Sequence, residues 1–231
     1  MGANGSARSL QPPLQRPLPA PLRVLVVDDH DLFRSGLCGL LSERGFEIVG
    51  DVPDGAAAVD RVRWLRPDVA VVGLDLSGLS GAETARRLAE TQPGVRIVGF
   101  LVTADPATVD DAVAAGVHSY LMKDATVEEI VAGIRLTAAG DSVLSPRVAT
   151  LILRRLQTER REDRGERVAS LTERESEVLP LLVAGKSNIE IAAALFISPG
   201  TAKNHIASIL DKLEAENRIQ AAVEAVRRGL V

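Results

Sequence analysis

The sequence predicts an α/β domain built on a five-stranded, doubly wound parallel sheet, followed by a small domain made only of helices. Short, Val-rich apolar runs alternate five times with amphipathic stretches of about 10–14 residues, the pattern of buried parallel strands and covering helices. After Leu171 the strand pattern ends and only short helical segments remain. The sequence therefore predicts two domains, one α/β and one all-helical.

Each predicted strand is followed by a predicted helix. The strands are Val24–Val27, Glu47–Gly50, Val69–Val72, Arg96–Leu101 and Val117–Leu121. The helices are Leu32–Arg44, Ala56–Leu65, Gly81–Glu90, Pro106–Ala115 and Val127–Ala139, and Cys38 and Trp64 are expected to be core or partly buried. Right-handed crossovers place such helices on both faces of the sheet, and chemistry then sits at the carboxyl ends of the strands.

The segments around this domain differ in composition. Residues 1–21 hold five of the twelve prolines and are predicted to be disordered. Residues 22–140 form the α/β domain. Residues 141–168 form a linker that is partly helical and increasingly charged, and residues 169–231 form the helical domain.

Helix-start signals organise the helical domain. Thr172 and Glu175 have the spacing of a capping box, and Ser198 followed by Pro199 is typical of a helix start. The four predicted helices end at about Val183, Leu195, Leu213 and Arg228. Two short helices joined by a tight turn and followed by a longer helix indicate a helix-turn-helix.

Composition excludes several classes of protein. A single cysteine excludes a disulfide framework and zinc sites built on paired cysteines. No apolar run approaches 18 residues and no signal-peptide core is seen, so we expect a cytoplasmic protein with no membrane partner. Aromatic residues make up only 3%, which argues against stacking platforms for single-stranded nucleic acid. The sequence contains no recognisable nucleophile–base pair, so we do not expect an enzyme.

Charge is distributed unevenly over a formal net charge of −4. Residues 24–153 hold 11 Lys and Arg against 19 Asp and Glu, a net charge of −8. Residues 171–231 hold 7 against 8, a net charge of −1. DNA contacts are therefore expected from local basic clusters of the helical domain, with weak binding as a monomer and dependence on a dimer.

Several stretches, in order along the chain, resemble a known family. They are Arg23-Val-Leu-Val-Val-Asp-Asp-His-Asp-Leu-Phe-Arg-Ser-Gly-Leu37, Ser119-Tyr-Leu-Met-Lys-Asp124, Leu171-Thr-Glu-Arg-Glu175, Ser187-Asn-Ile-Glu-Ile-Ala192, Thr201-Ala-Lys-Asn-His-Ile206 and Ile209-Leu-Asp-Lys-Leu213. Over residues 22–231 the chain resembles the NarL/FixJ two-component response regulators. The resemblance implies a flavodoxin-like receiver, a LuxR-type helix-turn-helix domain, double-stranded promoter DNA and RNA polymerase as partners, and a homodimer or a heterodimer with a related regulator.

The resemblance also implies a receiver pocket with an unusual residue set. Asp28 and Asp29 match the family's Mg²⁺-binding acidic pair, Lys123 matches its phosphoryl-pairing lysine, and Tyr120 matches its switch aromatic. Counting forward from Pro67-Asp68 and back from Gly81 both place the phosphoacceptor at Gly73. The family's fourth-strand Ser or Thr falls on Leu101. We therefore expect an atypical receiver with weak Mg²⁺ binding at most, and no other metal or cofactor.

Three modes of control stay open at this point. Regulation independent of aspartyl phosphorylation is the first, and Lys123 could then pair directly with Asp28 or Asp29. A conventional regulator phosphorylated on Asp75 is the second, although this needs a two-residue insertion on one side and a deletion on the other. The third is a pseudo-receiver whose reshaped pocket binds a metabolite.

The predicted DNA-binding residues gather around the second and third helices of the tail. In a helix-turn-helix the N-terminal end of the recognition helix enters the major groove. The recognition-helix residues are Thr201, Lys203, Asn204 and His205, with packing as the alternative role for His205. Lys186, Ser187 and Asn188 are placed at the DNA backbone, and Lys212 adds charge at the far end.

The last helix carries an apolar stripe. Its members are Ile219, Ala222, Val223 and Val226. The stripe resembles the family's dimer helix, and core packing is an equally open role.

Overall fold

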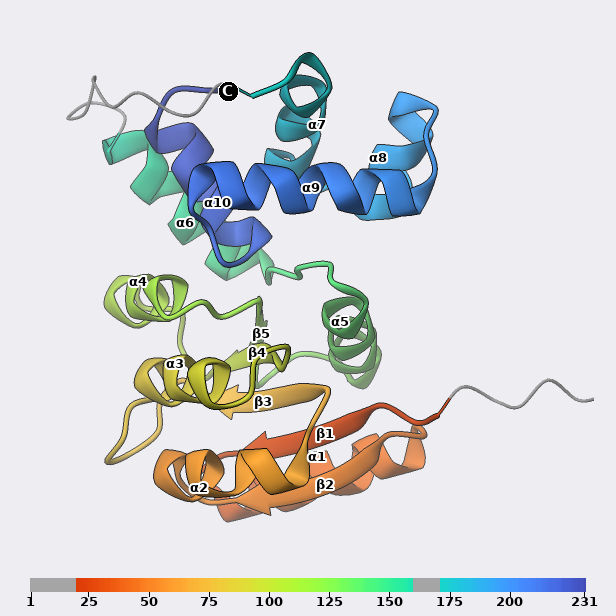
Figure 1. Cartoon of the computed structure of the whole chain (residues 1–231). Coiled ribbons are helices and arrows are strands. Elements are labelled where there is room, and N and C mark those ends of the chain that lie inside the picture. Colours follow the sequence, from red (N-terminus) through yellow and green to blue (C-terminus); the bar gives the residue numbers. More distant parts are fainter. Residues whose placement is uncertain (1–19, 160–170) are drawn as a thin grey trace, which may run out of the picture.

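The α/β domain of the computed structural model has one parallel sheet, in a structure that describes residues 20–159 and 171–231 (Figure 1). The strand order is β2-β1-β3-β4-β5. The strands are β1 (Arg23–Val27), β2 (Glu47–Val52), β3 (Val69–Gly73), β4 (Arg96–Leu101) and β5 (Ser119–Met122). The chain adds β2 on one side of β1 and β3, β4 and β5 on the other, and this change of side puts helices on both faces of the sheet, as predicted.

The helices divide between the two faces of the sheet. They are α1 (Asp31–Glu43), α2 (Gly55–Leu65), α3 (Gly81–Thr91), α4 (Pro106–Ala114) and α5 (Val127–Ala139). Side chains of α1 and α5 share a buried cluster with Val24, Val26 and Phe100, whereas those of α2, α3 and α4 share a cluster with Leu25 and Val27. Successive apolar residues of β1 therefore pack alternately into two cores, one on each face of the sheet.

The structure confirms the predicted order of elements and shifts some of their ends. The fifth strand is Ser119–Met122 rather than Val117–Leu121, because Gly116 has a φ of +79° and turns the chain just before it. The expected burial of Trp64 is wrong: its side chain is 88% exposed, since Ala58 and Val62 are the α2 residues that face the sheet. The predicted disorder up to residue 19, and the linker residues 160–168, lie outside the described residues.

A helix and a short extended segment connect the two domains. After α5, Tyr120 and residues 143–145 form a short parallel bridge, with the Tyr120 N–H donating to the Val143 carbonyl at 2.7 Å. Helix α6 (Pro146–Glu159) follows and buries Val148 and Ile152 in the core that contains α4. The linker predicted as partly helical thus begins with a helix packed on the receiver.

The helical domain has the predicted helix-turn-helix order. Its helices are α7 (Glu173–Val183), α8 (Asn188–Leu195), α9 (Pro199–Leu213) and α10 (Arg218–Arg227). They enclose a core of apolar side chains from all four helices, Val178, Ile191, Ile206, Ile209 and Ala221 among them. Figure 1 shows α10 and α6 beside α4, with α9 running across the helical domain below α7. No helix in the described parts of the chain is long and apolar enough to cross a membrane.

A buried carboxylate holds α7 against α9. Glu175 is 4% exposed and belongs to the capping box with Thr172. Its carboxylate also accepts hydrogen bonds from Lys212 Nζ and Ser208 Oγ, both at 2.6 Å. Led by the bond from Lys212, these contacts hold the pKa of Glu175 at about 2, below its ordinary 4.5. The ion pair is therefore part of the core of the domain.

Replacing Glu175 with Gln should destabilise the helical domain by about 3 kcal/mol at pH 7, because Lys212 then loses its buried partner. Since the folded pKa lies below the unfolded one, the stabilisation is complete above about pH 4.5 and is lost as the pH falls towards 2. Urea unfolding followed by circular dichroism at several pH values measures this difference. Glu190→Gln is the matched control, because Glu190 closes a similar capping box on an exposed surface.

Candidate functional sites at the sheet edge and on the helical domain

A buried ion pair lies at the carboxyl edge of the sheet. Asp28 follows β1 and Lys123 follows β5, and Asp28 Oδ2 lies 2.7 Å from Lys123 Nζ. The two side chains are 2% and 13% exposed. Asp28 Oδ1 accepts a hydrogen bond from the His30 N–H at 3.0 Å, and the Lys123 ammonium lies 5.0 Å from the centre of the Phe33 ring. Both charges are therefore engaged inside the protein.

Gly73, the last residue of β3, faces this ion pair. A Cβ atom at position 73 would lie 2.6 Å from Asp28 Oδ2 and 3.6 Å from the Val27 carbonyl oxygen. Any larger side chain would have to displace the Asp28 carboxylate. The space beside β3 is thus occupied by Asp28.

Asp29 is held by the loop after β3. Its Oδ2 accepts hydrogen bonds from the backbone N–H and the hydroxyl of Ser77, both at 2.9 Å. These bonds, the backbone one foremost, lower the pKa of Asp29. Asp29 is therefore ionised at neutral pH, with one oxygen already committed.

This donor set fits Mg²⁺ poorly. The ion requires near-octahedral oxygen ligands, and here it would have to displace Lys123 from Asp28 while a glycine supplies no carboxylate at position 73. Among residues 20–159 and 171–231 no group of three or more His, Cys, Asp or Glu side chains is arranged to hold a metal ion.

The remaining predicted pocket residues, Asp75, Leu101 and Tyr120, have different surroundings. Asp75 is exposed, and its Oδ2 accepts a hydrogen bond from the Val102 N–H at 2.9 Å, which ties the β3 loop to the β4 loop. Leu101 is fully buried at the end of β4. Tyr120 is fully buried as well, and burial raises the pKa of its phenol. Its ring faces the core rather than solvent.

The predicted recognition residues lie on one exposed end of α9. Thr201, Lys203 and Asn204 are exposed in the first turns, and His205 is half-buried. Ser198 caps the helix by accepting a hydrogen bond from the Thr201 N–H at 3.0 Å. The helix start therefore presents polar side chains and N–H groups together, as groove binding requires.

The other predicted DNA contacts have different surroundings. Lys186 and Ser187 both contact Glu190, at the start of α8. Lys212 lies instead in the buried pair with Glu175, so its charge is balanced within the domain core. The contribution of Lys212 to DNA binding stays a prediction.

The apolar stripe of α10 is covered within the chain. Ile219 is 5% exposed and packs in the same core as Val148 and Ile152 of α6, and Val223 and Val226 pack against that core. Ala222 packs in the core of the helical domain. In this conformation the stripe has the packing role that the sequence left open.

Polar contacts between the domains were missed by the sequence analysis. Gln220 Nε2 donates to the Val113 carbonyl at 2.8 Å. Arg218 Nη1 donates to Asp141 Oδ1 at 3.0 Å, and both side chains are nearly buried. Asn217 could be recognised as a helix cap, but no sequence signal indicates which residues of another domain a cap region will meet.

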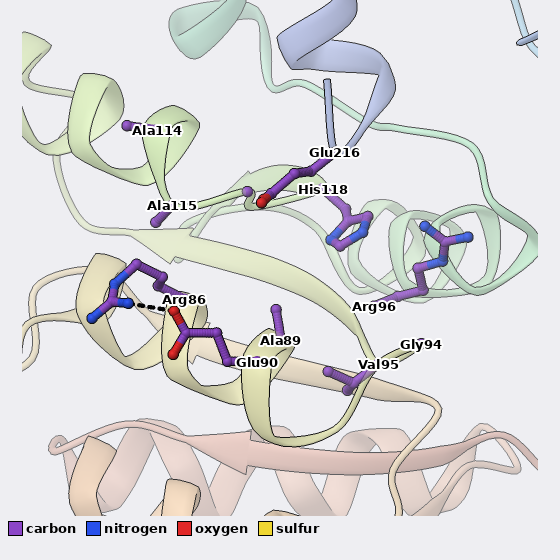
Figure 2. A pocket seen from close by; sticks show the side chains of 11 residues that line it. Arg86, Ala89, Glu90, Gly94, Val95, Arg96, Ala114, Ala115, His118 and Glu216 are labelled. Atoms are coloured by element: carbon purple, nitrogen blue, oxygen red, sulfur yellow. Dashed lines mark hydrogen bonds and ion pairs between the residues drawn. The ribbon is translucent and has the colours of Figure 1, made fainter. Parts of the chain in front are cut away.

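A cavity of about 450 Å³ lies at the opposite edge of the sheet, lined by receiver residues and by Glu216 of the helical domain (Figure 2). Arg86 and Glu90 of α3 line one wall, and Arg96 and His118 line another. Glu216, from the loop before α10, reaches in beside Gly116. Burial lowers the pKa of His118 to about 4, so this imidazole is neutral at pH 7.

The comparisons with known proteins agree with this architecture. The family model "Response regulator receiver domain" matches residues 24–135, and "Bacterial regulatory proteins, luxR family" matches residues 169–225. The chain belongs to the response regulators with a LuxR-type DNA-binding domain. It is a DNA-binding regulator of transcription of the two-component type.

Relatives and solved structures span nearly the whole regulator. The transcriptional regulatory protein DegU of Brevibacillus brevis is 32% identical, over 91% of this chain and 95% of its own. The response regulator VraR of Staphylococcus aureus is 33% identical, over 91% and 99%. The crystal structure of ChrA, described as the response regulator of a heme-sensing two-component system, has 30% identity and a TM-score of 0.51, over 92% and 100%. These relatives are regulators and not enzymes, as expected.

Replacing Lys123 of this regulator with Met should destabilise the receiver by about 3 kcal/mol, because Asp28 would remain buried without a cation. Adding Asp28→Asn should recover part of the loss. Denaturant unfolding of the wild type, the two single variants and the double variant measures the coupling. Arg147→Met, which breaks an exposed pair with Asp124, should change stability by no more than about 0.5 kcal/mol. Equal losses of stability in the Lys123 and Arg147 variants would contradict a stabilising role for the buried pair between Lys123 and Asp28.

Proposed function

We propose that this regulator binds promoter DNA under a control that does not use aspartyl phosphorylation of its receiver. The observation that carries the proposal is the ion pair between Asp28 and Lys123, with Gly73 in the place of an acceptor. Phosphoryl transfer needs a nucleophilic carboxylate and cations free to neutralise the transferred group. Here position 73 has no side chain, and Lys123 is engaged by Asp28.

Phosphorylation of Asp75 is less well supported. Asp75 lies two residues beyond β3, and its carboxylate is engaged by the Val102 N–H. Leu101 offers no hydroxyl at the end of β4 to bond a phosphoryl group. Under the proposal the pocket works without Mg²⁺, since Asp28 and Asp29 have protein donors of their own.

The receiver then serves as a docking partner for the helical domain. In the present conformation α4 and α6 cover the apolar stripe of α10. Separation of the domains would release Ile219, Val223 and Val226 for pairing with a second copy, or with a related regulator. The exposed start of α9 would then read two half-sites, and RNA polymerase is the proposed downstream partner.

The purified, unphosphorylated protein should enrich a paired half-site from random duplex DNA at a stated salt concentration. The reason is that Thr201, Lys203 and Asn204 are already exposed at the start of α9. The variant Lys203→Ala/Asn204→Ala is the control and should lose the enriched sequence. Failure of the folded protein to enrich any sequence would mean that binding needs a ligand or a second protein.

Acetyl phosphate with Mg²⁺ should leave no phosphoryl adduct on the protein, as read by intact mass, because position 73 has no carboxylate and those of Asp28 and Asp29 are engaged by Lys123 and Ser77. Asp75→Ala should leave affinity for the enriched duplex unchanged. A stable adduct that disappears in the Asp75→Ala protein would contradict phosphorylation-independent control.

A second candidate is control by a small ligand, and the cavity of Figure 2 is the observation that favours it. Its volume of about 450 Å³ is in the range of small-molecule sites, and Glu216 of the helical domain lines it together with receiver residues. A ligand there would bias the docked state. Calorimetry with small polar metabolites tests it, and heat that disappears in Arg96→Ala would support it.

A further inference from the structure

One carboxylate of the receiver side reaches the helical domain at the start of α8. Asp141 follows the Gly140 cap of α5, and its Oδ1 accepts hydrogen bonds from Arg218 Nη1 at 3.0 Å and from the Asn188 N–H at 3.3 Å. The Asp141 and Arg218 side chains are 12% and 8% exposed. A single anionic oxygen is therefore held between a guanidinium and the first N–H of a helix.

The groups that hold this oxygen all belong to the helical domain. Arg218 opens α10, and its Nη2 donates to the Lys186 carbonyl at 2.5 Å, which fixes the guanidinium beside the turn into α8. Ser187 caps α8 and orders its first turn. The donors therefore do not depend on Asp141 for their placement, and they form a built site for an oxyanion.

The position of this site in the motif indicates its natural ligand. In a helix-turn-helix the first helix crosses the DNA backbone while the second enters the major groove. Lys186 and Ser187, which flank the site, already have the side chains suited to backbone contact. A phosphate oxygen has the charge and the acceptor character of the carboxylate oxygen now bound.

We propose that Arg218 and the Asn188 N–H bind a DNA backbone phosphate, and that Asp141 occupies this site while the receiver is docked. The inference rests on the function as a DNA-binding regulator. The carboxylate and the phosphate exclude one another, because both need the same two donors and like charges repel. In the docked state Asp141 Oδ1 thus competes with a DNA phosphate oxygen for Arg218 and the Asn188 N–H.

The first test compares charge-matched variants of the full chain. Asp141→Asn should bind a fluorescent duplex of about three helical turns more tightly than the wild type, by about fivefold, because the site is vacated more easily. Asp124→Asn removes the same charge from an exposed pair and should not change the affinity. Fluorescence anisotropy at about 50–200 mM salt gives both the affinity and its salt dependence.

The second test removes each donor of the site in the Asp141→Asn background. Arg218→Gln should weaken binding and reduce the slope of log affinity against log salt by about 0.9, the value of one phosphate contact. Asn188→Pro removes the N–H at a helix position that accepts proline, and Ser187 already has the extended backbone (ψ 162°) that precedes one. It should bind more weakly than Asn188→Ala, which keeps the N–H.

The outcomes distinguish a failure of the proposed phosphate site from a failure of DNA binding itself. Equal affinities for Asp141→Asn, Asp124→Asn and the wild type would overturn the competition. Tighter binding by Asp141→Asn, with no further effect of Asn188→Pro over Asn188→Ala or of Arg218→Gln, would overturn the phosphate site and leave Asp141 as a plain interdomain contact. If no folded variant binds any duplex at the lowest salt, DNA binding itself fails and the site fails with it.

Discussion

The ion pair between Asp28 and Lys123 is the interaction on which the receiver pocket depends. A carboxylate that is 2% exposed is unfavourable unless a cation compensates it, and the parallel sheet supplies that cation by ending β5 beside β1. With no side chain at position 73, nothing competes with Asp28 for the space beside β3. Asp28 is therefore paired with Lys123, and Asp29 is held by the loop residue Ser77.

The same reasoning explains why the two domains pack as they do. The face of the sheet covered by α2, α3 and α4 continues through α6 to Ile219 of α10, so one apolar core joins receiver, linker and helical domain. The polar contacts at its rim involve Gln220 and Arg218, at the start of the same helix. Helix α10 is thus the element shared by the docked state and by any dimer formed through its stripe, and one surface cannot serve both at once.

Much of this architecture could be predicted from the sequence, since it depends on local patterns. Valine runs and helix caps placed nearly all of the elements, and the expected pairing of Lys123 with Asp28 or Asp29 was resolved by the structure in favour of Asp28. The failures concern which face of an element meets a neighbour. Trp64, which was expected to be buried, is on the outer face of α2. The contact of Asp141 with Arg218 joins residues 77 positions apart, and no periodicity or spacing carries that information.

The charge distribution indicates that the docked receiver also weakens DNA binding electrostatically. A helical domain with a net charge of −1 has little long-range attraction for DNA, so its affinity must come from a few well-placed cations and N–H groups. Docking places the receiver region, with a net charge of −8, against that domain, and adds a carboxylate at the start of α8. Separation removes the repulsion and exposes Arg218 in one step. Under the phosphorylation-independent control proposed above, the free energy for that step would come from the interface itself, through a partner, a ligand or DNA.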